Sequence, residues 1–198
     1  TTFASSSLFG MHTAIPDDDT DLTWYTPDKA NFQVYAVRNG YDTNNVHFVL
    51  TGTANGIIPN NLTSSLFEDV YDNQKWNFAV RVKPTGYPWA DFITGSATNT
   101  FDVEFYGTNV VDNRIHNEFS VTGTITNADG LTFTTSSHRM YVGAHRTDFA
   151  GAVLESSDVR VSALRYWMSY LDDTEIQAHA KDVENIGVKN PYRAAYVF

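Results

Sequence analysis

The sequence predicts an all-β protein, an antiparallel β-sandwich with one short helix near the C-terminus. Short segments that alternate apolar and polar residues recur at roughly ten-residue spacing, as they do in sandwiches. Turn-forming residues separate these segments, and a helical pattern with a defined start occurs only near Asp172. No internal repeat, low-complexity tract or linker interrupts the order. We therefore expect a single domain over residues 1–198.

The first half of the chain contains four expected strands. They are Ser7–His12, Phe32–Arg38, Val46–Thr51 and Leu66–Tyr71. Asn39-Gly40 follows the second of them, and this dipeptide is a strong hairpin-turn signal. The alternation of FQVYAVR is typical of a strand with one buried face.

The most amphipathic strand is expected at Lys75–Lys83, where Trp76, Phe78, Val80 and Val82 share one face. Further strands are expected at Phe101–Tyr106 and Phe119–Ile125, with residues 107–118 as the loop between them. Asn127–Gly130 then reads as a hairpin turn that leads to strands at Leu131–Thr134 and Arg139–Val142.

The C-terminal part is expected to run from a strand into a helix. Val159–Ala163 alternates, and Tyr166 and Trp167 continue it with aromatic side chains that we assign to the core. Asp172 and Glu175 then form a capping box at a helix start. Ile176, Ala180 and Val183 fall on one face of this helix, and the helix is expected to stop at Asn185 or Gly187.

Two stretches resemble a known family. ALRYWMSYLDDTEI, Ala163–Ile176, is similar to the last core strand and following helix of the laminin G-like and concanavalin A-like jelly rolls. MYVGAHRTDFAGAV, Met140–Val153, looks like an earlier strand and loop of the same family. The resemblance implies a concanavalin A-like jelly roll. It implies little about function, because this fold hosts sugar binders, adhesion modules, hydrolases and structural domains.

The composition limits the classes of partner that the protein is expected to bind. The net charge of −10 and the pI near 4.8 argue against nucleic acid or an anionic membrane as the main partner. There are no cysteines, and no apolar run is long enough for membrane insertion. The chain begins Thr1-Thr2-Phe3, so we expect a piece of a longer protein, located extracellularly, on a cell surface or on a virion surface.

Catalytic patterns are missing from the sequence, and we predict that the protein is not an enzyme. Asp102 and Glu104 have no third carboxylate at glycosidase spacing. Arg114 and His116 lie two apart and share a side if extended, which would suit a lyase, but a solvated loop pair is the simpler interpretation. No Gly-x-Ser-x-Gly motif and no metal-ligand spacing of histidines occurs.

Ca²⁺ is the one cofactor that the sequence raises, because an acidic run supplies hard oxygen ligands. Some members of the resembled family bind Ca²⁺ at one edge of the sandwich. The candidate ligands are Asp17, Asp19, Asp112 and Asp148. A solvated acidic loop is the alternative interpretation of each.

Sugar recognition needs an exposed aromatic ring and planar polar groups. Tyr87 and Trp89 supply the rings, and Asp91, Asn113 and Arg114 supply the polar groups if their loops meet. The alternative places Trp89 as a lid on the core. We expect a non-catalytic recognition module for a glycan or surface receptor. The alternatives are a structural or assembly module of a larger extracellular or virion protein, in contact with neighbouring subunits, and an atypical polysaccharide-acting enzyme.

Overall fold

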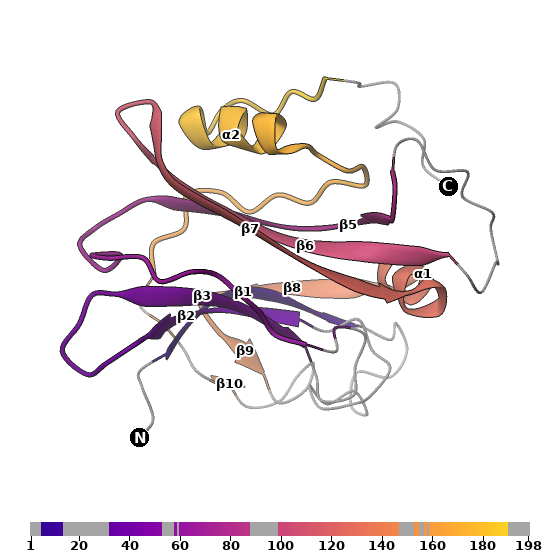
Figure 1. Ribbon diagram of the computed structural model, residues 1–198, viewed down its shortest axis with the longest axis horizontal. Helices are drawn as coiled ribbons and strands as arrows, with labels where there is room; N and C mark the ends of the chain where they lie inside the picture. Colours follow the sequence, from indigo (N-terminus) through magenta and orange to yellow (C-terminus); the bar gives the residue numbers. More distant parts are fainter. Residues whose placement is uncertain are drawn as a thin grey trace.

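The protein is a β-sandwich of two antiparallel sheets packed face to face (Figure 1). The computed structural model describes residues 5–13, 32–52, 58, 60–87, 99–146, 153–154, 157 and 159–189. The larger sheet has the order β4-β3-β2-β1-β8 and the smaller one β5-β6-β7, while β9 and β10 form a separate pair. This architecture confirms the all-β sandwich expected from the sequence.

The strands of the larger sheet are β1 (Ser5–Thr13), β2 (Phe32–Arg38), β3 (Val46–Gly52), β4 (Leu62–Thr63) and β8 (His138–Val142). Those of the smaller sheet are β5 (Trp76–Pro84), β6 (Thr100–Val111) and β7 (Arg114–Thr126). The short pair is β9 (His145–Arg146) and β10 (Val153–Leu154), and the helices are α1 (Asn127–Thr135) and α2 (Asp173–Lys181). Leu66–Tyr71, expected as a strand, contributes only a bridge between Phe67 and Val46.

Aromatic side chains from both sheets fill the space between them. Phe48 of β3 lies with its ring centroid 4.7 Å from those of Trp76 and Phe78 on β5. The ring of Phe105 on β6 is fully buried and lies 5.0 Å from that of Phe119 on β7. Because side chains alternate along a strand, this packing leaves the other residues of β5, β6 and β7 on the outer face of the smaller sheet.

Strands β6 and β7 form one long hairpin where the sequence suggested a loop over residues 107–118. Asp112 and Asn113 make the turn with φ values of 48° and 65°. Positive φ at both central residues is characteristic of a type I′ turn, which matches the twist of the flanking strands. Asp and Asn tolerate this conformation better than most residues.

Helix α1 replaces the hairpin turn and strand expected over residues 127–134. Thr126 caps it by accepting a hydrogen bond from the backbone N–H of Asp129. Gly130 lies so close to Phe101 that a Cβ atom there would overlap the ring. Phe133 is buried, and its ring stacks on Phe32 at 6.0 Å. Tertiary packing therefore favours a helix in a segment of β-branched and aromatic residues.

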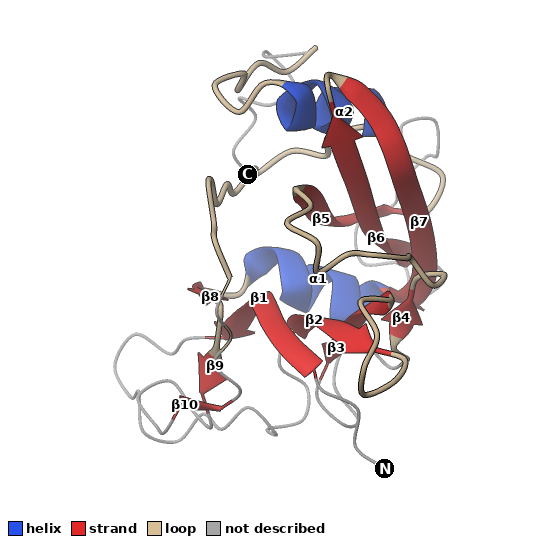
Figure 2. Ribbon diagram, turned by 90° about the vertical axis from the view of Figure 1, so that its left-hand side faces the viewer, coloured by secondary structure: helices blue, strands red, loops and turns tan. Residues whose placement is uncertain are grey.

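Of the strand and the helix expected in the C-terminal part, only the helix is present. The capping box of Asp172 and Glu175 is present at the start of α2, which ends at Lys181, so Val183 lies beyond it. Residues 159–171 form no strand and run as an extended segment, which leads to α2 over the outer face of the smaller sheet (Figure 2). Trp167 is partly buried as expected, but Tyr166 is 59% exposed and lies outside the core.

Candidate functional site

The structure separates the residues that the sequence proposed as one ligand site. Tyr87 follows β5 at one end of the smaller sheet, whereas Asn113 and Arg114 lie at the hairpin tip where β6 ends (Figure 1). β6 spans roughly 37 Å between these ends at about 3.4 Å per residue. Tyr87 therefore does not meet Asn113 or Arg114 within one chain. Trp89 and Asp91 lie outside the described residues.

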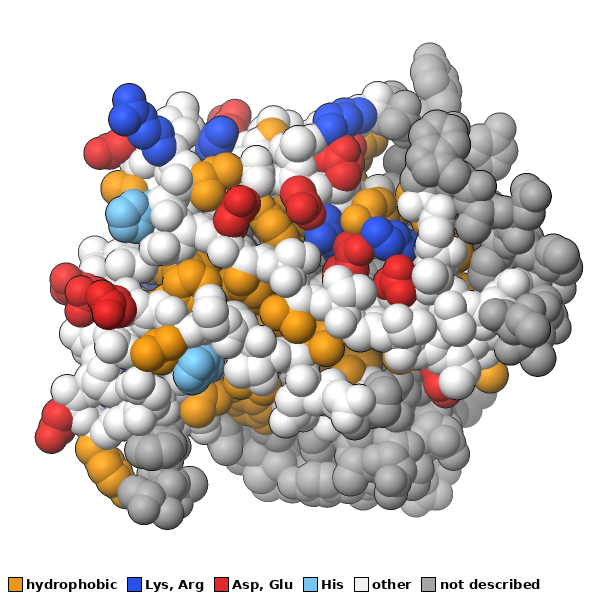
Figure 3. Space-filling view, in the orientation of Figure 1, with side chains coloured by type: hydrophobic (Ala, Val, Ile, Leu, Met, Phe, Trp, Pro, Cys, Tyr) orange, Lys and Arg blue, Asp and Glu red, His pale blue; other side chains and the backbone are white. Residues whose placement is uncertain are grey.

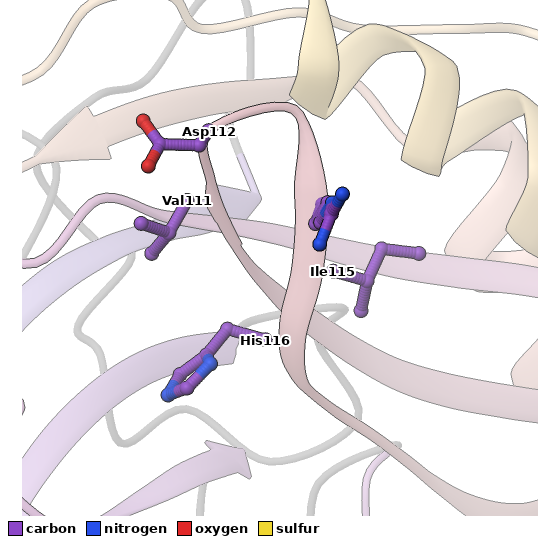
Figure 4. Close-up of a pocket in the computed structure, with 5 residues that line it drawn as sticks. Val111, Asp112, Ile115 and His116 are labelled. Carbon is purple, nitrogen blue, oxygen red and sulfur yellow. The ribbon is translucent and has the colours of Figure 1, made fainter.

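The hairpin tip has exposed polar side chains around a shallow hollow. Val111, Asp112, Arg114, Ile115 and His116 line this hollow (Figure 4). The register between β6 and β7 shifts by one residue near the tip: Asn109 pairs with Asn117, but the next residue, Val110, pairs with Ile115. His116 therefore has no partner on β6 and forms a bulge. Figure 4 shows His116 and Ile115 pointing to opposite sides of the strand. None of the described ion pairs involves the tip.

Of the four proposed Ca²⁺ ligands, only Asp112 lies within the described residues. Asp17, Asp19 and Asp148 lie outside the described residues. Asp112 is exposed at the tip. Within the described part of the chain, no three His, Cys, Asp or Glu side chains lie close enough to hold a metal ion together. Asp112 therefore belongs to no such group among the described residues.

A compact ionic cluster lies on the outer face of the smaller sheet, near the Tyr87 end. We call Arg81, Lys83, Glu104 and Tyr170 the Glu104 cluster. Glu104 Oε2 lies 3.1 Å from Arg81 Nη2, and Glu104 Oε1 lies 2.6 Å from Lys83 Nζ. The Tyr170 hydroxyl donates to Glu104 Oε2 at 2.8 Å. Both oxygens of this carboxylate are therefore occupied, and Figure 3 shows basic and acidic side chains gathered beside α2.

The Glu104 cluster also fastens the C-terminal segment to the sheet. Arg81 is buried, and its Nη1 contacts Asp173 Oδ1 of α2 at 2.6 Å and donates to the carbonyl of Leu171 at 3.0 Å. The Arg81 guanidinium also lies 5.2 Å from the centroid of the Tyr170 ring. One arginine thus connects β5, β6 and the start of α2.

The surroundings hold Glu104, Lys83 and Tyr170 in their ordinary charge states. Burial alone would raise the pKa of Glu104, but hydrogen bonds from Lys83 and Tyr170 and the charge of Arg81 lower it below its usual value. Burial would lower the pKa of Lys83, yet its bonds to Glu104 and Tyr170 raise that pKa above normal. Burial, followed by the bond to Glu104, raises the pKa of Tyr170.

An exposed aromatic ring and a carboxylate adjoin the cluster. Tyr87 is 41% exposed, and its ring centroid lies 5.6 Å from that of Tyr170. Asp102 Oδ1 accepts hydrogen bonds from the hydroxyls of Thr85, at 2.9 Å, and Thr124, at 3.3 Å. No described residue donates to Asp102 Oδ2. We call Tyr87, Tyr170, Thr85, Asp102 and Thr124 the Tyr87 surface.

The sequence contained only part of the signal for this site. The alternation of Lys75–Lys83 places Arg81 and Lys83 opposite the apolar face, and FDVEFY places Asp102 and Glu104 on one side of β6. The pairing of Arg81 with Glu104 depends on the register of β5 and β6. The contribution of Tyr170 depends on the path of residues 159–171, which the sequence suggested as a strand.

In comparisons with known proteins, no family model matches the chain, and no curated protein and no solved structure matches it significantly. Among the described residues, no helix has the length and apolar character needed to cross a membrane. The function of the site is therefore inferred from its chemistry.

Proposed function

We propose that the protein is a non-catalytic recognition module that binds a glycan or a glycosylated receptor through the Tyr87 surface. The observation that carries the proposal is the exposed Tyr87 ring, which lies beside Tyr170 and follows Thr85, a residue whose hydroxyl donates to the Asp102 carboxylate. Stacking on an aromatic ring and hydrogen bonding to planar acceptors are the two contacts that sugars require. A location on a cell or virion surface, and membership of the concanavalin A-like jelly rolls, belong to the same proposal.

The Glu104 cluster supports binding over catalysis. An acid or base works best when its pKa lies near the operating pH, and enzymes shift these values toward neutrality. In this cluster the pKa of Glu104 is lowered and those of Lys83 and Tyr170 are raised, so all three move away from neutrality. We therefore propose that the cluster holds Tyr170 in position beside Tyr87 and does not itself react. A polysaccharide-acting enzyme ranks last among the candidate functions.

A glycan array probed with the whole chain, with and without Ca²⁺, tests the proposal. Tyr87→Ala is the site variant, and Tyr166→Ala, which removes another exposed ring, is the matched control. We expect array signals that Tyr87→Ala loses and Tyr166→Ala keeps, while both variants keep the melting temperature. A folded wild-type protein with no signal, or a signal that both variants retain, would contradict the proposal.

The exposed apolar side chains of the C-terminal segment favour a second function, assembly into a larger structure. Leu164, Tyr166 and Met168 are each about half exposed or more, at 49%, 59% and 55%, and they alternate with partly buried residues. Exposed apolar side chains that form a patch mark many protein interfaces, and these three lie at alternate positions of one short segment. An assembly module would show concentration-dependent mass in sedimentation, which Leu164→Ser combined with Met168→Ser would abolish.

A further inference from the structure

The outer face of the smaller sheet continues from the Tyr87 surface into a row of short hydroxyl side chains on β7. Ser120, Thr122 and Thr124 are all exposed. Their partners across the sheet are Tyr106, Glu104 and Asp102, in that order. The row therefore lies directly beside the two carboxylates of β6.

Helix α2 leaves this row uncovered. Gln177 of α2 bonds to the Tyr106 hydroxyl and to Glu118, so the helix approaches the row only at its Ser120 end. The start of α2 reaches Arg81 on β5 through Asp173, and Figure 2 shows the helix near the hairpin tip of β6 and β7. The exposed outer surface of β7 from Ser120 to Thr124 is therefore a strip of small polar side chains, along which an extended polymer can lie.

The charge of Asp102 determines which polymer fits. The two cations of the neighbouring cluster already form ion pairs with carboxylates. Arg81 pairs with Glu104 and with Asp173, and Lys83 pairs with Glu104. No described Lys or Arg forms an ion pair with Asp102. An ionised carboxylate only accepts hydrogen bonds, and it repels other anions where the surroundings are partly desolvated.

We propose that the ligand of the Tyr87 surface is a neutral, hydroxyl-rich polysaccharide chain and not a uronate or sulfated one, an inference that rests on the proposed function. One sugar ring stacks on Tyr87, and a sugar hydroxyl donates to Asp102 Oδ2. Neighbouring sugars lie along Thr124, Thr122 and Ser120. Rejection of anionic chains comes from the charge of Asp102, with which no described Lys or Arg forms an ion pair, and this charge acts against the wrong ligand.

Affinity electrophoresis in gels that contain one polysaccharide each tests this specificity. The probes are two pairs that share a backbone: hydroxyethyl cellulose with carboxymethyl cellulose, and dextran with dextran sulfate. Soluble β-1,3-glucan, mannan and alginate extend the panel. The variants are Asp102→Ala, Asp102→Asn and Tyr87→Ala, with Thr63→Val at the exposed residue of β4 as the control. Thermal melting verifies that each variant is folded.

The inference predicts that at least one neutral polymer retards the wild-type protein and that no anionic polymer does so more strongly than its neutral counterpart. Asp102→Ala and Tyr87→Ala should each weaken retardation at least tenfold, and Asp102→Asn should narrow the difference between neutral and anionic polymers. Stronger retardation by an anionic polymer, or neutral binding that needs Tyr87 but not Asp102, would overturn the inference and leave the proposed function standing. Absence of retardation by every polymer would overturn the inference, and the glycan array then decides the proposed function.

Discussion

The two ends of the smaller sheet carry similar residue types but differ in how those residues are held. The Tyr87 end has an aromatic ring, carboxylates and cations joined by contacts of 2.6 to 3.1 Å to Glu104. The hairpin tip has Asp112, Arg114 and His116, all exposed and none of them in a described ion pair. Fixed side chains lose less conformational entropy on binding than mobile ones. A set of suitable residues is thus a weaker indication of a site than a network that positions them.

The contrast predicts a large difference in stability between equivalent alanine substitutions. Glu104→Ala leaves Arg81 and Lys83 without their shared carboxylate in a mostly buried position, and we expect it to lower the free energy of unfolding by about 3 kcal/mol. Arg114→Ala at the exposed tip should change it by less than about 0.5 kcal/mol. Urea denaturation measures both, and equal effects would contradict the distinction between the two ends.

The tip is expected to owe its shape to its backbone turn. Asn113 has a φ of 65°, so Asn113→Ala places an unfavourable residue in the left-handed region and should cost about 1 to 2 kcal/mol. Asn113→Gly, which has no such penalty, is the control and should stay close to the wild type. Chemical denaturation checks this, and a neutral Asn113→Ala would show that the turn relaxes freely.

Acid should lower the free energy of unfolding through the loss of the Glu104 contacts at the Tyr87 end. The folded-state pKa of Glu104 lies below its ordinary 4.5, so its contribution is present above that value and is lost as the pH falls through the folded-state pKa. We expect stability to decline below pH 4.5, and Glu104→Gln should reduce the slope of that decline. Urea midpoints at several pH values provide the measurement. An unchanged slope in Glu104→Gln would place the acid sensitivity elsewhere.

A smaller effect is expected at the start of α2. Burial alone would raise the pKa of Asp172, but bonds from Lys189, Thr174 and the Glu175 backbone lower it to about 2 from 3.8. Lys189→Met should therefore raise this pKa toward 3.8. Because both side chains are about half exposed, the cost in stability should be only a few tenths of a kcal/mol. Carboxyl NMR titration follows the shift, and a pKa that stays near 2 would assign it to the helix cap alone.

The sequence predicted the elements with strong local patterns. The strands around Phe32–Arg38, Val46–Thr51 and Lys75–Lys83 follow from alternation, and the start of α2 follows from the Asp172 capping box. Helix α1 was missed because its stability comes from Phe133 and Gly130 packing against Phe32 and Phe101, which lie far away in the chain. The long hairpin was missed because Asp112-Asn113 is a weaker turn signal than Asn-Gly.

The grouping of Tyr87 with Asn113 and Arg114 in one site failed for a different reason. The sequence proposed Tyr87 as a binding residue together with Asn113 and Arg114, because no local pattern shows that β6 separates them. The Glu104 cluster draws one residue from β6, two from β5 and one from the C-terminal segment. Such a cluster depends on strand register and on tertiary packing, and neither can be read from spacing along one chain.

The most direct test of recognition at the Tyr87 end is a map of backbone amide shifts by NMR during titration with a ligand found on the glycan array. We predict that the largest changes fall on Lys83, Thr85, Tyr87, Asp102 and Thr124, with little change at residues 111–116. Changes concentrated at the hairpin tip, with the Tyr87 end unaffected, would contradict the assignment of the binding surface.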